Sequence, residues 1–275
     1  MPQIPPQNGQ LPSLLRAAGL KPPSSLFKAE FPQIQLPPPE DHFQTPEASS
    51  AKASPSLDLF SSGRPLIGPG TKVLHIGDSH TVGIYGQEMD KLLRATGAQV
   101  STYGSAGSSP SWWLKGTSTH SGFFSRDDQG KVDAPKDWRA PHPTPKLPDL
   151  LKKHQPTVIM ISLGANLIGA NAATIESQVK ELAEIAKASG AQIIWVGPPD
   201  GRESKKPNSK QTNLYNHLKA AASQYGAFID SRPLTEYPEK GGDGLHYWGT
   251  EGSKIAKSWT HEVFEQIQAL PPQAN

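Results

Sequence analysis

Short apolar runs alternate with stretches of helical periodicity from Thr71 onward. This alternation is typical of parallel strands joined by crossover helices, because parallel neighbours need a long connection between them. We expect strands at 72–76, 99–103, 157–163, 192–196 and 227–230. We expect helices near 82–96, 147–154, 172–189, 210–225 and 250–270.

The pattern within these stretches predicts a five-stranded parallel sheet with helices on both faces. In the stretch 172–189, apolar side chains recur at steps of three and four and form one stripe: Ile175, Val179, Leu182, Ala183 and Ala186. Sheets of this class bind ligands at the carboxyl ends of their strands. We therefore expect functional residues directly after strands.

The first part of the chain has a different composition. Of the 28 prolines, 12 fall within the first 56 residues, including the triplet Pro37-Pro38-Pro39. Proline removes a backbone donor and breaks helices and sheet ladders. We predict that 1–62 is a largely irregular extension, with one short helix near 11–20, which acts as a tether or as an arm that contacts a partner. A single globular domain would then occupy 63–270.

Charge and composition exclude several classes of partner and cofactor. The 27 Lys and Arg residues nearly balance 25 Asp and Glu, so the net charge of +2 predicts no nucleic-acid binding. No run of eighteen apolar residues exists, which predicts no membrane span. The chain has no cysteine, and we expect neither a metal nor an organic cofactor. Met1 is not followed by a signal peptide, so we expect a cytoplasmic protein, or a periplasmic or secreted one whose export signal lies upstream.

The most informative motif is Gly77-Asp78-Ser79-His80, which follows the first predicted strand and precedes a helix. A serine at this edge can expose its hydroxyl while its backbone N–H lies at a helix start. That placement suits a nucleophile whose developing oxyanion needs amide donors. The alternative is that Ser79 only caps the helix.

Two further loops follow strands at the same edge. Gly107 lies in the loop after the second predicted strand, and Asn166 in the loop after the third. The N–H groups of Ser79 and Gly107 and the side-chain amide of Asn166 could together form an oxyanion hole. Taken singly, such a glycine is usually a turn device and such an asparagine a cap.

A late loop contains Asp243-Gly244-Leu245-His246, just before the last predicted helix. A serine hydroxyl needs a nearby imidazole to accept its proton, and a carboxylate can orient that imidazole. Asp243 and His246 are therefore the candidate orienting acid and base. The Asp-x-x-His spacing alone is a weak signal.

Together, these residues resemble the SGNH or GDSL hydrolases over about 71–268. The match includes Ser79 in block one, Gly107 in block two, Asn166 in block three, and Asp243 with His246 in block five. The resemblance implies a flavodoxin-like three-layer α/β/α domain with serine esterase or acetyl-transfer chemistry.

The sequence departs from the family pattern at two positions. The family usually has a second acid where this chain has Leu167, and Leu or Ile where it has His80. Gly-Asp-Ser-His is similar to the variant in bacterial peptidoglycan O-acetylesterases. His75, by contrast, lies within a predicted strand and is expected to be a core residue.

A proline-rich insertion at 110–148 contains five aromatic residues between the second strand and the next helix. A loop this long is usually functional or disordered. We expect it to wall the substrate cleft, with Trp112 or Trp113 presenting a flat apolar face to substrate. His80 and Trp248 are further candidate substrate contacts. The alternative is that these indoles only attach the loop to the domain.

These observations lead us to expect a serine esterase that removes O-acetyl groups from a carbohydrate or cell-wall polymer such as peptidoglycan. One alternative is an O-acyltransferase that uses the same serine. The other is a non-catalytic module that binds glycans or acts as a scaffold.

Overall fold

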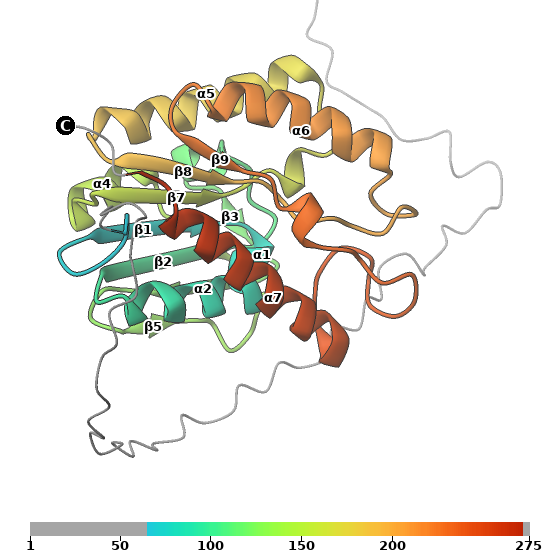
Figure 1. The fold of residues 1–275 in the computed structure, drawn as a ribbon, viewed down its shortest axis with the longest axis horizontal. Helices are drawn as coiled ribbons and strands as arrows, with labels where there is room; N and C mark the ends of the chain where they lie inside the picture. Colours follow the sequence, from blue (N-terminus) through green and yellow to red (C-terminus); the bar gives the residue numbers. More distant parts are fainter. Residues whose placement is uncertain (1–64, 272–275) are drawn as a thin grey trace, which may run out of the picture. The chain divides into compact units, whose positions relative to one another are not determined.

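The computed structural model describes residues 65–271, which form a seven-stranded sheet between two helical layers (Figure 1). The strand order is β5-β4-β2-β1-β7-β8-β9. Five strands are parallel: β1 (Lys72–Gly77), β2 (Gln99–Ser105), β7 (Val158–Ser162), β8 (Gln192–Val196) and β9 (Ala227–Ile229). The expected three-layer architecture with five parallel strands is confirmed.

The sheet has seven strands, two more than the five that we expected from the sequence. The strands β4 (Phe123–Arg126) and β5 (Val132–Asp133) extend it with antiparallel pairing beyond β2. Both lie in the insertion, as does the separate pair β3 (Ser118–Thr119) and β6 (His142–Pro143). These strands are too short to produce a periodic signal, so the sequence pattern missed them.

Helices cover both faces of the sheet (Figure 1). One layer contains α2 (Ile84–Ala95) and α7 (Gly249–Gln268), and the other contains α4 (Leu147–His154), α5 (Ala172–Ala188) and α6 (Asn208–Ala222). Shorter helices occur in the loops: α1 (Ser79–Val82), α3 (Trp112–Lys115), η1 (Ala165–Leu167) and η2 (Arg232–Leu234). The helix expected at 82–96 is divided by Gly83, which is extended with ψ −159°.

Two hydrophobic cores form because alternate residues of a strand point to opposite faces. On β1, Val73 joins the core beneath α2 and α7, whereas Leu74 and Ile76 join the core beneath α4, α5 and α6. The stripe expected on α5 is fully buried in the second of these cores. Packing on both faces thereby buries the sheet between the two helical layers.

The extension at 1–62 and its short helix lie outside the described residues, so the domain boundary remains a prediction. Within residues 65–271, no helix has both the length and the apolar character needed to cross a bilayer.

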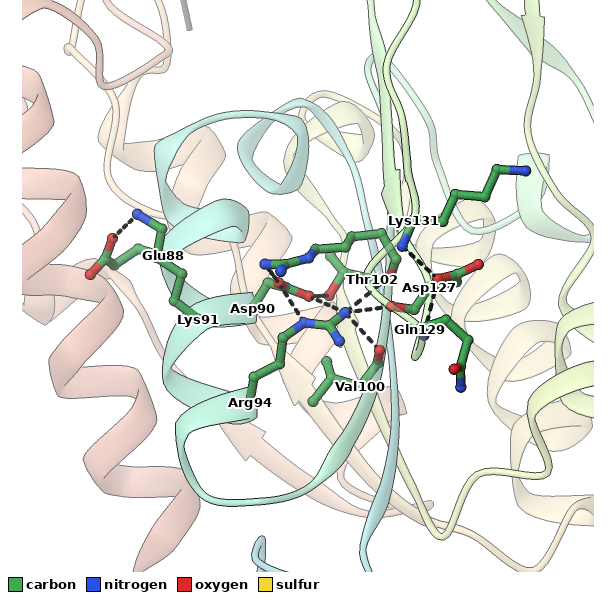
Figure 2. Close-up of polar contacts among 10 residues, drawn as sticks. Glu88, Asp90, Lys91, Arg94, Val100, Thr102, Asp127, Gln129 and Lys131 are labelled. Carbon is green, nitrogen blue, oxygen red and sulfur yellow. Dashed lines mark hydrogen bonds and ion pairs between the residues drawn. The ribbon is translucent and has the colours of Figure 1, made fainter. Parts of the chain in front are cut away.

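A buried carboxylate attaches the insertion to the rest of the domain (Figure 2). Asp90 on α2 is 1% exposed and accepts hydrogen bonds from Arg94 at 2.9 and 3.0 Å, from Arg126 on β4 at 3.0 Å, and from Thr102 on β2 at 2.9 Å. Arg94 also donates to the carbonyl oxygen of Asp127 at 2.8 Å. One acidic side chain thus joins a helix, a parallel strand and an antiparallel strand.

We expect Asp90→Ala to lower the free energy of unfolding by about 3 kcal/mol, because it leaves two guanidinium groups without their carboxylate partner. Lys91→Ala is the matched control on the same helix, since Lys91 forms an exposed ion pair with Glu88. Its expected effect is below about 1 kcal/mol. Urea unfolding of both variants measures the difference, and equal losses would contradict the structural role of Asp90.

His75 is a core residue, as expected. It is 0% exposed, its Nε2 lies 3.0 Å from the hydroxyl of Ser162, and the hydroxyl of Tyr85 lies 3.1 Å from that same oxygen. Burial lowers the pKa of His75 to about 4, although the negative charge of Asp90 acts in the opposite direction. The folded protein therefore holds this imidazole neutral at pH 7.

This burial predicts a pH dependence of stability. In the unfolded chain the pKa of His75 returns to 6.5, so the unfolded chain binds more protons than the folded one between pH 6.5 and about 4. The contribution of neutral His75 is complete above pH 6.5 and is lost as the pH falls toward 4. We expect His75→Gln to make this decline shallower, by up to about 1.4 kcal/mol per pH unit.

Chemical denaturation across this pH range measures the effect. Tyr85→Phe is the control, because it removes a hydrogen bond to the same Ser162 hydroxyl but no group that titrates in this range. Its curve should run parallel to that of the wild type. A parallel curve for His75→Gln would show that His75 does not cause the pH dependence.

Candidate active site

Three loops with candidate residues follow adjacent strands of the sheet. Ser79 follows β1, Gly107 follows β2, and Asn166 follows β7, and both β2 and β7 pair with β1. The ends of these strands are in register, since Gly77 faces Gly104 on one side and Ser162 on the other. Parallel pairing therefore brings the three loops to one edge.

Ser79 is the first residue of α1, and its hydroxyl does not cap that helix. The cap is Asp78, whose carboxylate accepts a hydrogen bond from the N–H of His80 at 3.0 Å. Gly77 is required because a Cβ at that position would overlap the side chain of Thr81. The hydroxyl of Ser79 is instead directed to His246, with 2.9 Å between its oxygen and Nε2.

Asp243 holds the other side of the His246 ring. Its Oδ2 lies 2.7 Å from Nδ1, and its Oδ1 accepts backbone hydrogen bonds from Leu245 and His246, each at 2.8 Å. Burial opposes ionisation of Asp243, but these hydrogen bonds together hold its pKa below the usual range. Because the ionised carboxylate can only accept hydrogen bonds, it fixes the imidazole hydrogen on Nδ1, which leaves Nε2 as the acceptor for the serine hydroxyl.

The three expected oxyanion donors lie in loops that follow adjacent strands at the edge where Ser79 lies. Within residues 65–271, the N–H groups of Ser79 and Gly107 have no hydrogen-bond partner. Gly107 adopts φ +82°, a conformation that favours glycine. The amide nitrogen of Asn166 donates to the carbonyl oxygen of Ser108 at 3.0 Å, which connects the loops after β7 and β2. Both Gly107 and Asn166 are exposed at the edge.

The two adjacent tryptophans of the insertion, Trp112 and Trp113, lie in different surroundings. Trp113 is 0% exposed and donates from its indole nitrogen to the hydroxyl of Ser108 at 3.2 Å. The prediction that Trp113 contacts substrate is therefore wrong, because its ring belongs to the core. Trp112 is half-buried, and its ring lies 3.8 Å from the position of a Cβ on Gly107. Trp248 is also half-buried and directly precedes α7.

His80 does not present its ring at the surface either, which corrects its expected role as a substrate contact. It is 8% exposed, and its ring centroid lies 5.5 Å from that of His246 and 5.8 Å from that of Trp259. Burial, followed by the positive charges of Lys206 and His246, lowers its pKa well below 6.5. A neutral His80 thus packs between His246 and the core.

One buried cation near the site was not expected from the sequence. Lys206 is 6% exposed, and burial lowers its pKa, although Asp78, Asp243 and Asp200 raise it. Burial also raises the pKa of Asp78 to about 6, against the opposing effects of the His80 N–H and of Lys206. The polar surroundings of Lys206 in the sequence resemble an ordinary exposed loop, so no local signal marks it.

Within the described residues, no cluster of three or more His, Cys, Asp or Glu residues could hold a metal ion. The arrangement is instead that of a hydroxyl, an imidazole and a carboxylate in a hydrogen-bonded series, next to free backbone donors. This arrangement can transfer the hydroxyl proton to Nε2 as the serine oxygen attacks an electrophile.

Comparison with known proteins adds information about the fold. No protein-family model matches the chain, and no curated protein matches it. An acetyl xylan esterase from Geobacillus stearothermophilus has a similar structure, with a TM-score of 0.51 and 19% identity over 76% of this chain and 99% of that chain.

Two other similar structures have lower scores. A GDSL-like lipase from Bacteroides thetaiotaomicron has a TM-score of 0.43 and 15% identity over 71% of this chain and 88% of that chain. A family 3 carbohydrate esterase from Clostridium thermocellum has a TM-score of 0.46 and 14% identity over 73% of this chain and 98% of that chain. The acetyl xylan esterase supports the fold that the SGNH or GDSL resemblance implies.

Proposed function

We propose that this protein is a serine esterase that removes O-acetyl groups from a carbohydrate, of which peptidoglycan is one example. The observation that carries the proposal is the 2.9 Å contact between the Ser79 oxygen and His246 Nε2, with Asp243 at 2.7 Å from Nδ1 of the same ring. Separations of this size permit direct proton transfer from a nucleophile to its base.

In the proposed reaction, the Ser79 oxygen attacks the acetyl carbonyl carbon while its proton passes to His246 Nε2. Asp243 stabilises the imidazolium that results. The N–H groups of Ser79 and Gly107 and the amide of Asn166 stabilise the negative oxygen of the tetrahedral intermediate. His246 then protonates the departing sugar oxygen, which leaves an acetyl ester on Ser79.

The second half of the reaction restores the enzyme. A water molecule gives a proton to His246 Nε2 and attacks the acetyl carbonyl carbon. Collapse of the second tetrahedral intermediate breaks the bond to Ser79, and His246 returns the proton to the serine oxygen. The products are acetate and the free serine.

Two observations favour an acetylated carbohydrate as substrate. The acetyl xylan esterase from Geobacillus stearothermophilus has the same overall fold. The half-buried Trp112 lies beside the Gly107 loop, where its indole can pack against the apolar face of a sugar ring. A cell-wall polymer as substrate would further require export of the protein.

We expect Ser79→Ala to abolish both the burst of acylation and steady-state release of acetate, because it removes the hydroxyl that forms the acyl enzyme. The measurements are p-nitrophenyl acetate turnover, release of acetate from O-acetylated cell-wall polymer, and labelling by a serine-directed fluorophosphonate. Unchanged turnover in the variant would refute the nucleophile. Transfer of acetyl groups to an added oligosaccharide instead of water would identify an acyltransferase.

Asn166→Ala is expected to lower kcat by on the order of a hundredfold, because it removes one donor to the oxyanion. Asn171→Ala is the matched control, since Asn171 caps α5 through the N–H of Thr174 and lies outside the site. That control should lose some stability but retain its kcat. Equal kcat in both variants would exclude Asn166 from the oxyanion hole.

A further inference from the structure

The loop that carries Asp243 and His246 has little regular structure of its own. Gly241, Gly242 and Gly244 all adopt positive φ, at +76°, +60° and +84°. Glycine-rich segments lose more conformational entropy on folding than others do. We therefore expect contacts from outside the loop to hold the Asp243 carboxylate and the His246 imidazole in position.

One buried hydroxyl supplies several of these contacts. The oxygen of Tyr237 accepts a hydrogen bond from the N–H of Gly244 at 3.1 Å and donates to the carbonyl oxygen of His246 at 3.0 Å. Oδ1 of Asp243 lies 3.4 Å away as a second acceptor. A Cβ on Gly242 would overlap this hydroxyl, so the loop is wrapped closely around it.

Tyr237 is itself fixed by the segment that follows β8. Its N–H donates to the carboxylate of Asp200 at 3.0 Å, and the guanidinium of Arg202 lies 5.2 Å from the centre of its ring. Arg202 also donates to the carbonyl oxygen of Pro238 at 3.0 and 3.1 Å, and to that of Gly241. The backbone N–H of Arg202 donates to the carbonyl oxygen of Gly244 at 3.0 Å. Asp200 and Arg202 therefore tie Tyr237 to a segment outside the loop.

We propose that Tyr237 is a positioning residue whose hydroxyl holds Asp243 and His246 in their hydrogen-bonding geometry with Ser79. This inference rests on the proposed function, because it concerns the same base and orienting acid. Tyr237 does not touch the reacting atoms; it acts through the backbone of the loop. Burial raises its pKa, so the hydroxyl remains a donor at neutral pH.

The test compares two tyrosine-to-phenylalanine variants. Tyr237→Phe removes the hydroxyl and keeps the ring against Arg202. Tyr247→Phe is the matched control: it is also buried, its ring lies 4.9 Å from that of Tyr237, and its hydroxyl donates to the carbonyl oxygen of Asp200 at 2.9 Å. Each variant loses a hydroxyl from one aromatic cluster, but only Tyr237 contacts the Asp243 loop through that group.

We expect Tyr237→Phe to lower kcat by about ten- to a hundredfold with KM unchanged, because misplacing a base slows the chemical step without altering binding. Tyr247→Phe should retain kcat, and the two thermal midpoints should fall by similar amounts. The low-field proton resonance of His246 Nδ1–H, assigned by its loss in Asp243→Asn, should broaden or disappear only in Tyr237→Phe.

Retention of kcat and of the resonance in Tyr237→Phe would overturn the proposal. The proposal would also be overturned if both variants lost kcat in proportion to the fall in their thermal midpoints, because such losses would indicate a purely structural effect. If the wild type hydrolyses no ester and is not labelled by fluorophosphonate, the proposed function fails separately. The resonance then decides whether Tyr237 orders the loop: its loss supports that role and its retention overturns it.

Discussion

The hydrogen bond between Ser79 and His246 is the contact on which the candidate site depends, and it joins residues 167 positions apart in the chain. Neither partner is placed by its immediate neighbours alone. Parallel pairing of β1 with β2 and β7 fixes the serine and its adjacent donors at one edge. The loop before α7 must then return to that edge, and its position relative to β1 is maintained by the packing of α7 against α2.

Burial sets the charge of the groups around this contact. His75 and His80 are kept neutral because their rings are buried, while Asp243 is kept ionised by the hydrogen bonds that it accepts. His246 is the half-buried imidazole that faces the serine, with the ring of His80 behind it and the carboxylate of Asp243 beside it. Lys206 contributes a buried positive charge near Asp78 and Asp243. These environments assign different roles to chemically similar side chains.

The insertion at 110–148 is part of the domain and contributes to the site in two ways. Asp90 binds Arg126 on β4, which anchors the antiparallel extension (Figure 2). Trp113 is buried and supports the loop after β2 through Ser108. Only Trp112 of this tryptophan pair remains partly accessible beside Gly107. The insertion therefore combines attachment with a candidate substrate wall, the two roles that sequence analysis left as alternatives.

The sequence by itself determined the five parallel strands, most helices and the segments that contain Ser79, Asn166 and His246, because periodicity and strand-to-helix motifs are local. Only the tertiary structure decided which indole is buried, how far β4 and β5 extend the sheet, and that Lys206 lies among carboxylates. The same holds for Tyr237, whose hydroxyl reaches the Asp243 loop. Burial and hydrogen bonding in these cases depend on segments distant in the chain, and no local pattern records which distant segments meet.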